Sequence, residues 1–117
     1  MTSKTIISII NTISKAAQVI LDIYESGDFG IEIKVDNSPL TLADQAANEV
    51  IIETLKKMEY PILSDEGSSI KYKDRKHWDK FWLVDPLDGT KEFIKKNGEF
   101  TINIALIENG QATTVFV

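Results

Sequence analysis

The chain contains no cysteine and only one histidine, His77, among its 117 residues. Without cysteine, it can form neither a disulfide nor a thiolate metal site. A single imidazole excludes the usual zinc sites and any chemistry that needs two histidines.

Basic residues are also fewer than acidic ones. The chain has 13 lysines and arginines and 18 acidic residues, which gives a formal net charge of −5. A general nucleic-acid binder is therefore not expected, since phosphate backbones select basic surfaces. A small phosphorylated substrate remains compatible with this charge, because bound metal ions supply positive charge locally.

Long uninterrupted apolar runs are missing as well, and none reaches the ~20 residues needed to span a bilayer. We therefore expect no stable membrane insertion. The first residues lack a small-residue cleavage pattern, so a cytoplasmic location is the default, and peripheral association with the inner membrane stays compatible with it. At 117 residues with 43% hydrophobic content, the chain is long enough for one small domain with a modest core.

Helical spacing of apolar residues predicts a helix over residues 4–25, ended by Gly27. Its apolar positions are Ile6, Ile9, Ile10, Ile13, Ala17, Ile20, Leu21 and Tyr24. Such a stripe is either a face for a partner, including a second copy, or a face packed on the core. Core packing is favoured, because surface helices normally bury their apolar stripe.

Further elements follow along the chain. Alternation predicts a strand over 31–35, broken at 37–39. Thr41 and Asp44 form a capping box that starts a helix over 42–58. Its expected buried positions are Leu42, Ala46, Val50, Ile51, Leu55 and Met58. A short strand over 61–64, a strand over 81–84, a helical turn over 92–96 and a hairpin of 101–107 with 112–117 complete the prediction.

The segment Asp85-Pro86-Leu87-Asp88-Gly89-Thr90 follows the apolar strand 81–84. Two carboxylates at the exit of a strand can converge on one hard cation such as Mg²⁺. The same hexapeptide also suits a tight turn in which the aspartates bond the local backbone. An EF-hand loop is excluded, because Leu87 stands where a side-chain ligand is needed. The pair is also one residue too widely spaced for an Asp-x-Asp nucleophile, so a metal-activated water fits better.

The run WLVDPLDGTKEF, followed by NGEFTINIALI, resembles the metal-dependent, lithium-sensitive phosphomonoesterase superfamily that includes the inositol monophosphatases. The continuation Lys91-Glu92-Phe93 and the segment 97–100 resemble one branch, the CysQ-like 3'(2'),5'-bisphosphate nucleotidases. Segments 36–44 and 61–66 fit the same branch in the same order. The resemblance covers nearly the whole chain.

This resemblance implies an α+β fold, the layered αβαβα sugar-phosphatase fold, with residues 1–117 as its N-terminal α/β part. Members are considerably longer, and a further metal-binding Asp and much of the substrate pocket lie in the part beyond. The chain is therefore expected to be truncated. A non-catalytic fragment that binds metal weakly, or self-associates into a homo-oligomer through its last strand, is the alternative.

The implied activity is hydrolysis of 3'-phosphoadenosine 5'-phosphate to AMP and phosphate, with inositol and sugar phosphates as alternative substrates. Mg²⁺ is the implied cofactor. Asp85, Asp88 and the Leu87 carbonyl match metal ligands, and Asp44 and Thr90 match the residues that orient the attacking water. The implied substrate contacts are Asp65, Leu87, Asp88, Gly89 and Thr90.

At Asp65 the sequence departs from the resembled family, which usually has Glu there, shared between two metal ions. Asp is one methylene shorter, so Glu66 is the alternative ligand, and metal affinity is the property affected. On their own, Asp65 and Glu66 also suit a solvated acidic loop. The basic, aromatic run 71–80 is expected to be an ordinary solvated connection rather than a lid over the site.

Overall fold

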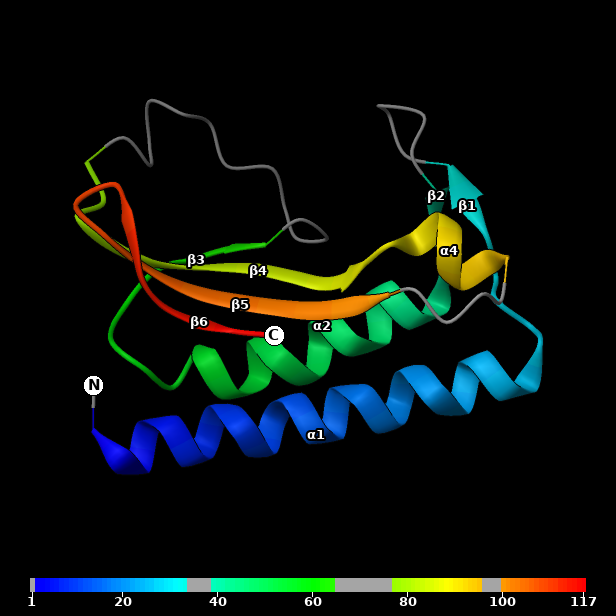
Figure 1. Cartoon of the computed structure of the whole chain (residues 1–117), viewed down its shortest axis with the longest axis horizontal. Helices are drawn as coiled ribbons and strands as arrows, with labels where there is room; N and C mark the ends of the chain where they lie inside the picture. Colours follow the sequence, from blue (N-terminus) through cyan, green and yellow to red (C-terminus); the bar gives the residue numbers. More distant parts are fainter. Residues whose placement is uncertain (1, 34–38, 65–76, 96–99) are drawn as a thin grey trace.

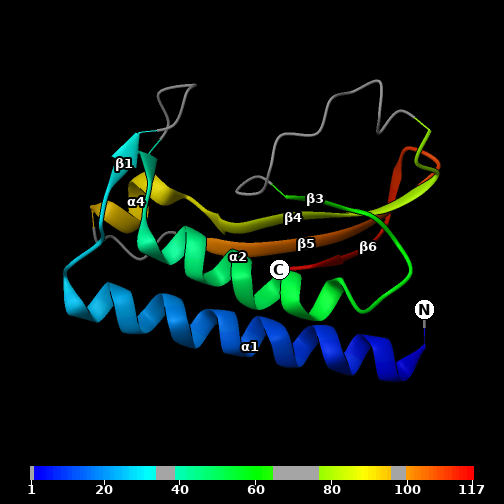
Figure 2. The same ribbon diagram turned by 180° about the vertical axis from the view of Figure 1, so that it is seen from behind.

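A computed structural model gives the fold, and it describes residues 2–33, 39–64, 77–95 and 100–117. Two long helices, α1 (Ser3–Ser26) and α2 (Leu42–Leu55), cover one face of a four-stranded sheet (Figure 1). Seen from behind, α2 lies between α1 and the strands, and both helices stay on the same side of the sheet (Figure 2). The described residues therefore form an α-layer on a β-layer, as the α+β prediction requires.

The sheet has the strand order β3-β4-β5-β6. Its strands are β3 (Ile62–Ser64), β4 (Lys80–Asp88), β5 (Thr101–Glu108) and β6 (Gln111–Phe116). β3 pairs parallel with β4, whereas β4–β5 and β5–β6 are antiparallel. Asn109 and Gly110 join β5 to β6 with positive φ angles of 51° and 80°, which a two-residue hairpin turn needs. The predicted hairpin is confirmed, and β4 runs four residues further than the predicted strand.

Helix α1 confirms the prediction for residues 4–25 almost to the residue. The Thr2 hydroxyl accepts from the Thr5 amide at its start, and Gly27 ends it with a φ of 76°, a conformation that glycine adopts at low cost. Ile9, Ala16 and Ile20 are fully or nearly fully buried.

Two residues of the stripe that was predicted to pack on the core are exposed to solvent instead. Ile10 and Leu21 are 51% and 44% exposed, so their assignment to the core is wrong. The apolar arc of α1 is wider than the strip that the sheet and α2 can cover, and its outer part is left facing solvent.

Helix α2 begins with the predicted capping box and ends at Leu55, three residues earlier than predicted. Leu42, expected in the core, is 45% exposed because it is the first residue of the helix and lies beside Gly30. The Leu42 amide donates to the Phe29 carbonyl at 2.8 Å. A buried polar contact joins the two helices, with 2.6 Å between the Thr12 and Thr54 hydroxyl oxygens.

The core between the layers is formed by inward-facing side chains of the sheet, including Trp82, Val84, Ile104 and Leu106, against the buried faces of the helices. At one end, a cluster of rings holds the short helix α4 (Thr90–Ile94) in place. Phe93 is fully buried, and its ring centroid lies 5.3 Å from that of Tyr24 and 4.7 Å from that of Phe29. This anchor fixes the segment that follows β4.

Two small strands, β1 (Glu32–Ile33) and β2 (Pro39–Leu40), pair antiparallel beside α4. The predicted strand over 31–35 is therefore described only in part, because residues 34–38 lie outside the described ranges. Most of the basic run 71–80 also lies outside them, so its interpretation as a connection stays a prediction.

One described helix, α1, is long and apolar enough to cross a membrane by length and composition. No such segment was expected from the sequence. Polar residues interrupt the apolar runs of α1, but its mean hydropathy is still high enough to meet the criterion. This is weak evidence for a span, since a helix that packs on a core passes the same test.

Candidate active site

A bulge in β4 brings the two aspartates of the hexapeptide to one face of the sheet. In a regular strand, residues three apart point to opposite faces. Here Asp85 pairs with Asn103 and Asp88 with Thr101, so β4 has one residue more than β5 between these pairs. Pro86 and Leu87 are both buried as a result. Asp85 and Asp88 share the opposite face, which the described helices α1 and α2 do not cover.

Asn103 completes this polar patch from the neighbouring strand. It is the register partner of Asp85, and its amide nitrogen donates to Asp88 Oδ2 at 3.2 Å. Asn103 was not predicted as a site residue from the sequence. Its position in an otherwise apolar alternating strand, two residues after Thr101, was the available signal.

Asp44 lies on the helix side of the same end of β4, at the start of α2, and is fully buried. Its Oδ2 accepts from the Thr41 amide at 2.7 Å and from the Thr41 hydroxyl at 2.6 Å. Its Oδ1 accepts from the Thr90 hydroxyl at 2.9 Å. Three donors thus satisfy a carboxylate that would be costly to bury without partners.

Thr90 connects this buried carboxylate to the aspartate segment. Gly89 has a φ of 93° and turns the chain from β4 into α4, of which Thr90 is the first residue. The Thr90 hydroxyl lies 2.9 Å from Asp44 Oδ1 and 3.2 Å from the Leu87 carbonyl oxygen. Having one proton, it donates best to the shorter contact and keeps oxygen lone pairs for another donor.

The structure therefore gathers Asp44, Thr90, Leu87, Asp85 and Asp88 around the end of β4. It describes neither Asp65 nor Glu66, which lie outside the described ranges. Strand β3 ends one residue before Asp65 and pairs parallel with β4, Ser64 being the partner of Val84. The Ser64 hydroxyl also donates to Asn48 on α2 at 2.5 Å. Asp65 thus follows a strand end that is fixed next to Asp85.

Within the described ranges, no three acidic or histidine side chains come close enough together to hold a metal ion. Two carboxylates, a carbonyl oxygen and a hydroxyl are nevertheless oxygen donors of the kind that Mg²⁺ prefers. The turn interpretation, in which the aspartates bond the local backbone, stays a prediction, since the local contact of this segment at 3.2 Å joins the Thr90 hydroxyl to the Leu87 carbonyl. The two interpretations are compatible.

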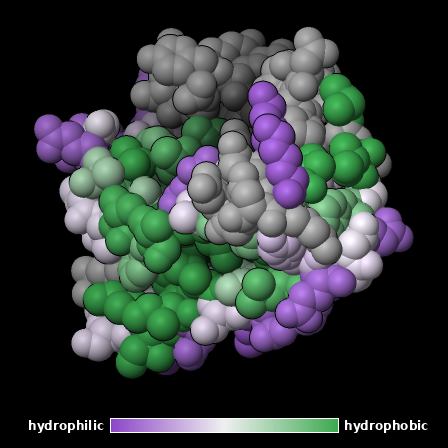
Figure 3. All heavy atoms as spheres, turned by 45° about the vertical axis from the view of Figure 1, so that its right-hand side comes forward, coloured by the Kyte–Doolittle hydropathy of each residue, from purple (hydrophilic) through white to green (hydrophobic). Residues whose placement is uncertain are grey.

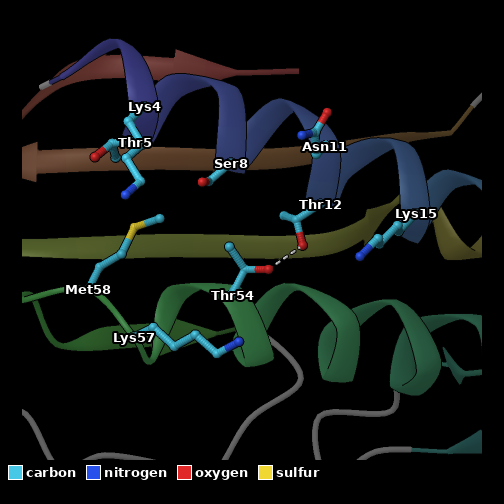
Figure 4. Close-up of a pocket in the computed structure, with 9 residues that line it drawn as sticks. All are labelled: Lys4, Thr5, Ser8, Asn11, Thr12, Lys15, Thr54, Lys57 and Met58. Carbon is cyan, nitrogen blue, oxygen red and sulfur yellow. Dashed lines mark hydrogen bonds between the residues drawn. The ribbon is translucent and has the colours of Figure 1, made fainter.

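A separate groove of about 580 Å³ lies between α1 and α2, away from these residues (Figure 4). Lys4, Lys15 and Lys57 line it, together with the hydrogen-bonded Thr12 and Thr54. The lysine ammonium groups lie at different parts of the groove and do not point toward one spot (Figure 4). No residue of the candidate site lines this groove.

The family model described as "Inositol monophosphatase family" matches residues 2–117. The chain belongs to the inositol monophosphatase family. Family members called 3'(2'),5'-bisphosphate nucleotidase CysQ are similar to it. The one from Escherichia coli K12 is 48% identical over 99 residues, which cover 82% of this chain and 40% of that protein. The one from Salmonella typhimurium is 58% identical over 80 residues, covering 67% and 32%.

Solved structures of the family confirm the fold. The crystal structure of CysQ from Bacteroides thetaiotaomicron matches with 48% identity and a TM-score of 0.78, over 95% of this chain and 41% of that one. The protein suhB from Bartonella henselae, at 24% identity and a TM-score of 0.81, supports the fold alone. The chain thus spans about two fifths of the length of the relatives it matches.

Proposed function

We propose that this chain is the N-terminal part of an inositol-monophosphatase-like domain whose complete protein is a Mg²⁺-dependent phosphomonoesterase. Its proposed reaction is hydrolysis of 3'-phosphoadenosine 5'-phosphate to AMP and phosphate. The observation that carries the proposal is the bulge of β4, which sets Asp85 and Asp88 on one face beside the Thr90–Asp44 contact. The choice of substrate rests on the names of the CysQ relatives.

Asp85, Asp88 and the Leu87 carbonyl oxygen would hold Mg²⁺, with Asp65 or Glu66 completing its ligands. When bound, the metal supplies positive charge for the phosphate and makes a bound water a better nucleophile. Asp88 is exposed, whereas Asp85 is half-buried, so of the two carboxylates Asp88 is the more accessible to solvent and substrate.

Thr90 would orient the attacking water, and Asp44 would accept its proton. The Thr90 hydroxyl donates its proton to Asp44, so its remaining lone pairs can accept a hydrogen from the water and orient it. Asp44, fixed by the Thr41 amide and hydroxyl, is the acceptor to which that proton can pass through Thr90. Substrate contacts are proposed for Asp65, Leu87, Asp88, Gly89 and Thr90.

Phosphate release tests this proposal in a form of the protein as long as its relatives. With Mg²⁺ present, we expect 3'-phosphoadenosine 5'-phosphate to be hydrolysed with a kcat/KM at least tenfold above that for an inositol monophosphate or a sugar phosphate. A preference for an inositol or sugar phosphate would support the phosphatase activity and contradict the proposed substrate. No release from any of them would leave the non-catalytic alternative.

A further inference from the structure

The face of β4 and β5 that points away from α1 and α2 changes from apolar to polar at one pair of residues. Neighbouring side chains of a strand alternate between its two faces, and the buried residues of both strands point toward the helices. The register partners that share the other face are Phe81 with Ile107, Leu83 with Ala105, and Asp85 with Asn103. The first two pairs are apolar, so Asn103 lies where the polar part of this face begins.

Asparagine is an unusual residue for this position. It is among the residues that are depleted in strands, and Asn103 lies within β5 between the buried Ile102 and Ile104. Apolar surface is also exposed elsewhere on the molecule, and it gathers at the lower left in Figure 3, on the side that holds α1 and β6. Strand propensity does not account for an amide at position 103, so its hydrogen-bond partner is the informative observation.

That partner is one oxygen of Asp88. Asn103 Nδ2 donates to Asp88 Oδ2 at 3.2 Å, and an ionised carboxylate only accepts, so the nitrogen of the amide faces it. Asp88 pairs in register with Thr101, so the contact runs diagonally between the two strands. Among the described residues, no other side chain donates to Asp88, and its Oδ1 accepts no hydrogen bond from them.

We propose that Asn103 is a positioning residue of the candidate metal site, an inference that rests on the proposed function. By holding Oδ2, the amide limits rotation of the Asp88 carboxylate and keeps Oδ1 available to Mg²⁺. Hydrogen bonds of this kind orient the carboxylates that bind metals and strengthen metal binding. A neutral amide suits the task, because it orients Asp88 without offsetting the negative charge that a cation needs, as a lysine would.

Calorimetric titration with Mg²⁺, in a form of the protein as long as its relatives, tests this role. Asn103→Leu keeps the size of the side chain and removes the donor, so the dissociation constant for Mg²⁺ rises at least about tenfold. Asn103→Ala removes the same donor with a smaller side chain and gives the same rise. The matched control, Gln111→Leu, removes an exposed amide at the start of β6 and leaves the constant within about twofold. Thermal unfolding without Mg²⁺ checks that all three variants stay folded.

Phosphate release over a range of Mg²⁺ concentrations separates positioning from a merely structural role. For Asn103→Leu, the half-saturating Mg²⁺ concentration rises with the dissociation constant. At saturating Mg²⁺ its kcat stays within about threefold of wild type, because excess cation compensates for weaker binding. A kcat that saturating Mg²⁺ does not restore, together with an unchanged dissociation constant, overturns the positioning role.

The two measurements distinguish failure of this inference from failure of the proposed function. If Asn103→Leu weakens Mg²⁺ binding but the wild type releases phosphate from no substrate, the positioning role stands and the proposed function fails. If the wild type releases phosphate and Asn103→Leu binds Mg²⁺ as tightly, the positioning role is overturned and the function stands. A wild type that binds no Mg²⁺ overturns both.

Discussion

Asp85 and Asp88 are acidic residues whose role depends on the local backbone. The bulge at Pro86 and Leu87 brings them to one face, where Asn103 holds Asp88 through a 3.2 Å hydrogen bond. Both carboxylates therefore face the same side of the sheet. This arrangement is compatible both with a pair of metal ligands and with aspartates that stabilise a turn, and substitution of the two residues separates these roles.

We expect Asp85→Asn and Asp88→Asn to abolish phosphate release in a form of the protein as long as its relatives, because an amide offers no charge to offset Mg²⁺. Asp79→Asn, just before β4 at its other end, is the control and should leave activity intact. Isothermal calorimetry with Mg²⁺ measures binding independently of turnover. Activity within about tenfold of wild type, ~1.4 kcal/mol in barrier, would show that the pair serves only the turn.

Thr90 is both a structural and a functional residue, because its hydroxyl satisfies the buried Asp44. Thr90→Val keeps the shape and removes that donor, so unfolding should become easier by about 1–3 kcal/mol. Urea denaturation of the chain measures this change. Thr101→Val, which alters an exposed hydroxyl in β5, should shift stability by less than about 0.5 kcal/mol. Equal effects of both substitutions would argue against the Thr90–Asp44 contact.

At the scale of elements, the start of α2 determines where Asp44 stands. Its first turn is held by the capping box of Thr41 and Asp44 and by the Leu42 amide, which donates to the Phe29 carbonyl. Gly30 makes this approach possible, because a Cβ there would lie 2.7 Å from Leu42 Cγ and its φ is +53°.

Gly30→Ala should therefore destabilise the fold by about 2–4 kcal/mol, from the left-handed backbone together with the crowding. Gly27→Ala provides the matched control. It has a similar φ of +76° but nothing within 4 Å of the added Cβ, so it should cost only about 1–2 kcal/mol. The midpoint of thermal unfolding ranks the two variants. If Gly27→Ala lowers the midpoint of thermal unfolding as much as Gly30→Ala does, the left-handed backbone conformation alone accounts for the loss of stability.

For the whole molecule, the chain covers about 40% of its relatives' length, and the described helices α1 and α2 lie on one face of its sheet. The other face carries the candidate ligands Asp85 and Asp88, with the 42% exposed Leu83 on the same strand. Catalysis also needs an enclosure that excludes water and orients the substrate, and among the described residues neither α1 nor α2 supplies one on this face.

We therefore expect the 117 residues alone to give no measurable turnover, whereas a form extended to the relatives' length should hydrolyse the bisphosphate. Steady-state phosphate release from both forms, at equal Mg²⁺ and protein concentration, makes this comparison. Turnover by the short form at the usual enzymatic order, roughly 1 s⁻¹ or more, would show that residues 1–117 are sufficient.

Local chemistry in the sequence determined most of the elements. The capping box, the glycine after α1, the Asn-Gly turn and the alternation of β5 act over a few residues, so their pattern predicts them. The four ordered motifs indicated the family, which the family model and the CysQ relatives confirm.

Tertiary structure decided which face each residue occupies. Periodicity placed Ile10 and Leu21 in the core, but the width of the sheet and of α2 left them exposed. A spacing of three could not tell whether Asp85 and Asp88 share a face, because that depends on a bulge defined only by pairing with β5. The Thr90–Asp44 contact joins residues 46 positions apart, and only the packing of β4 against α2 and of α4 against β2 brings them within hydrogen-bonding distance.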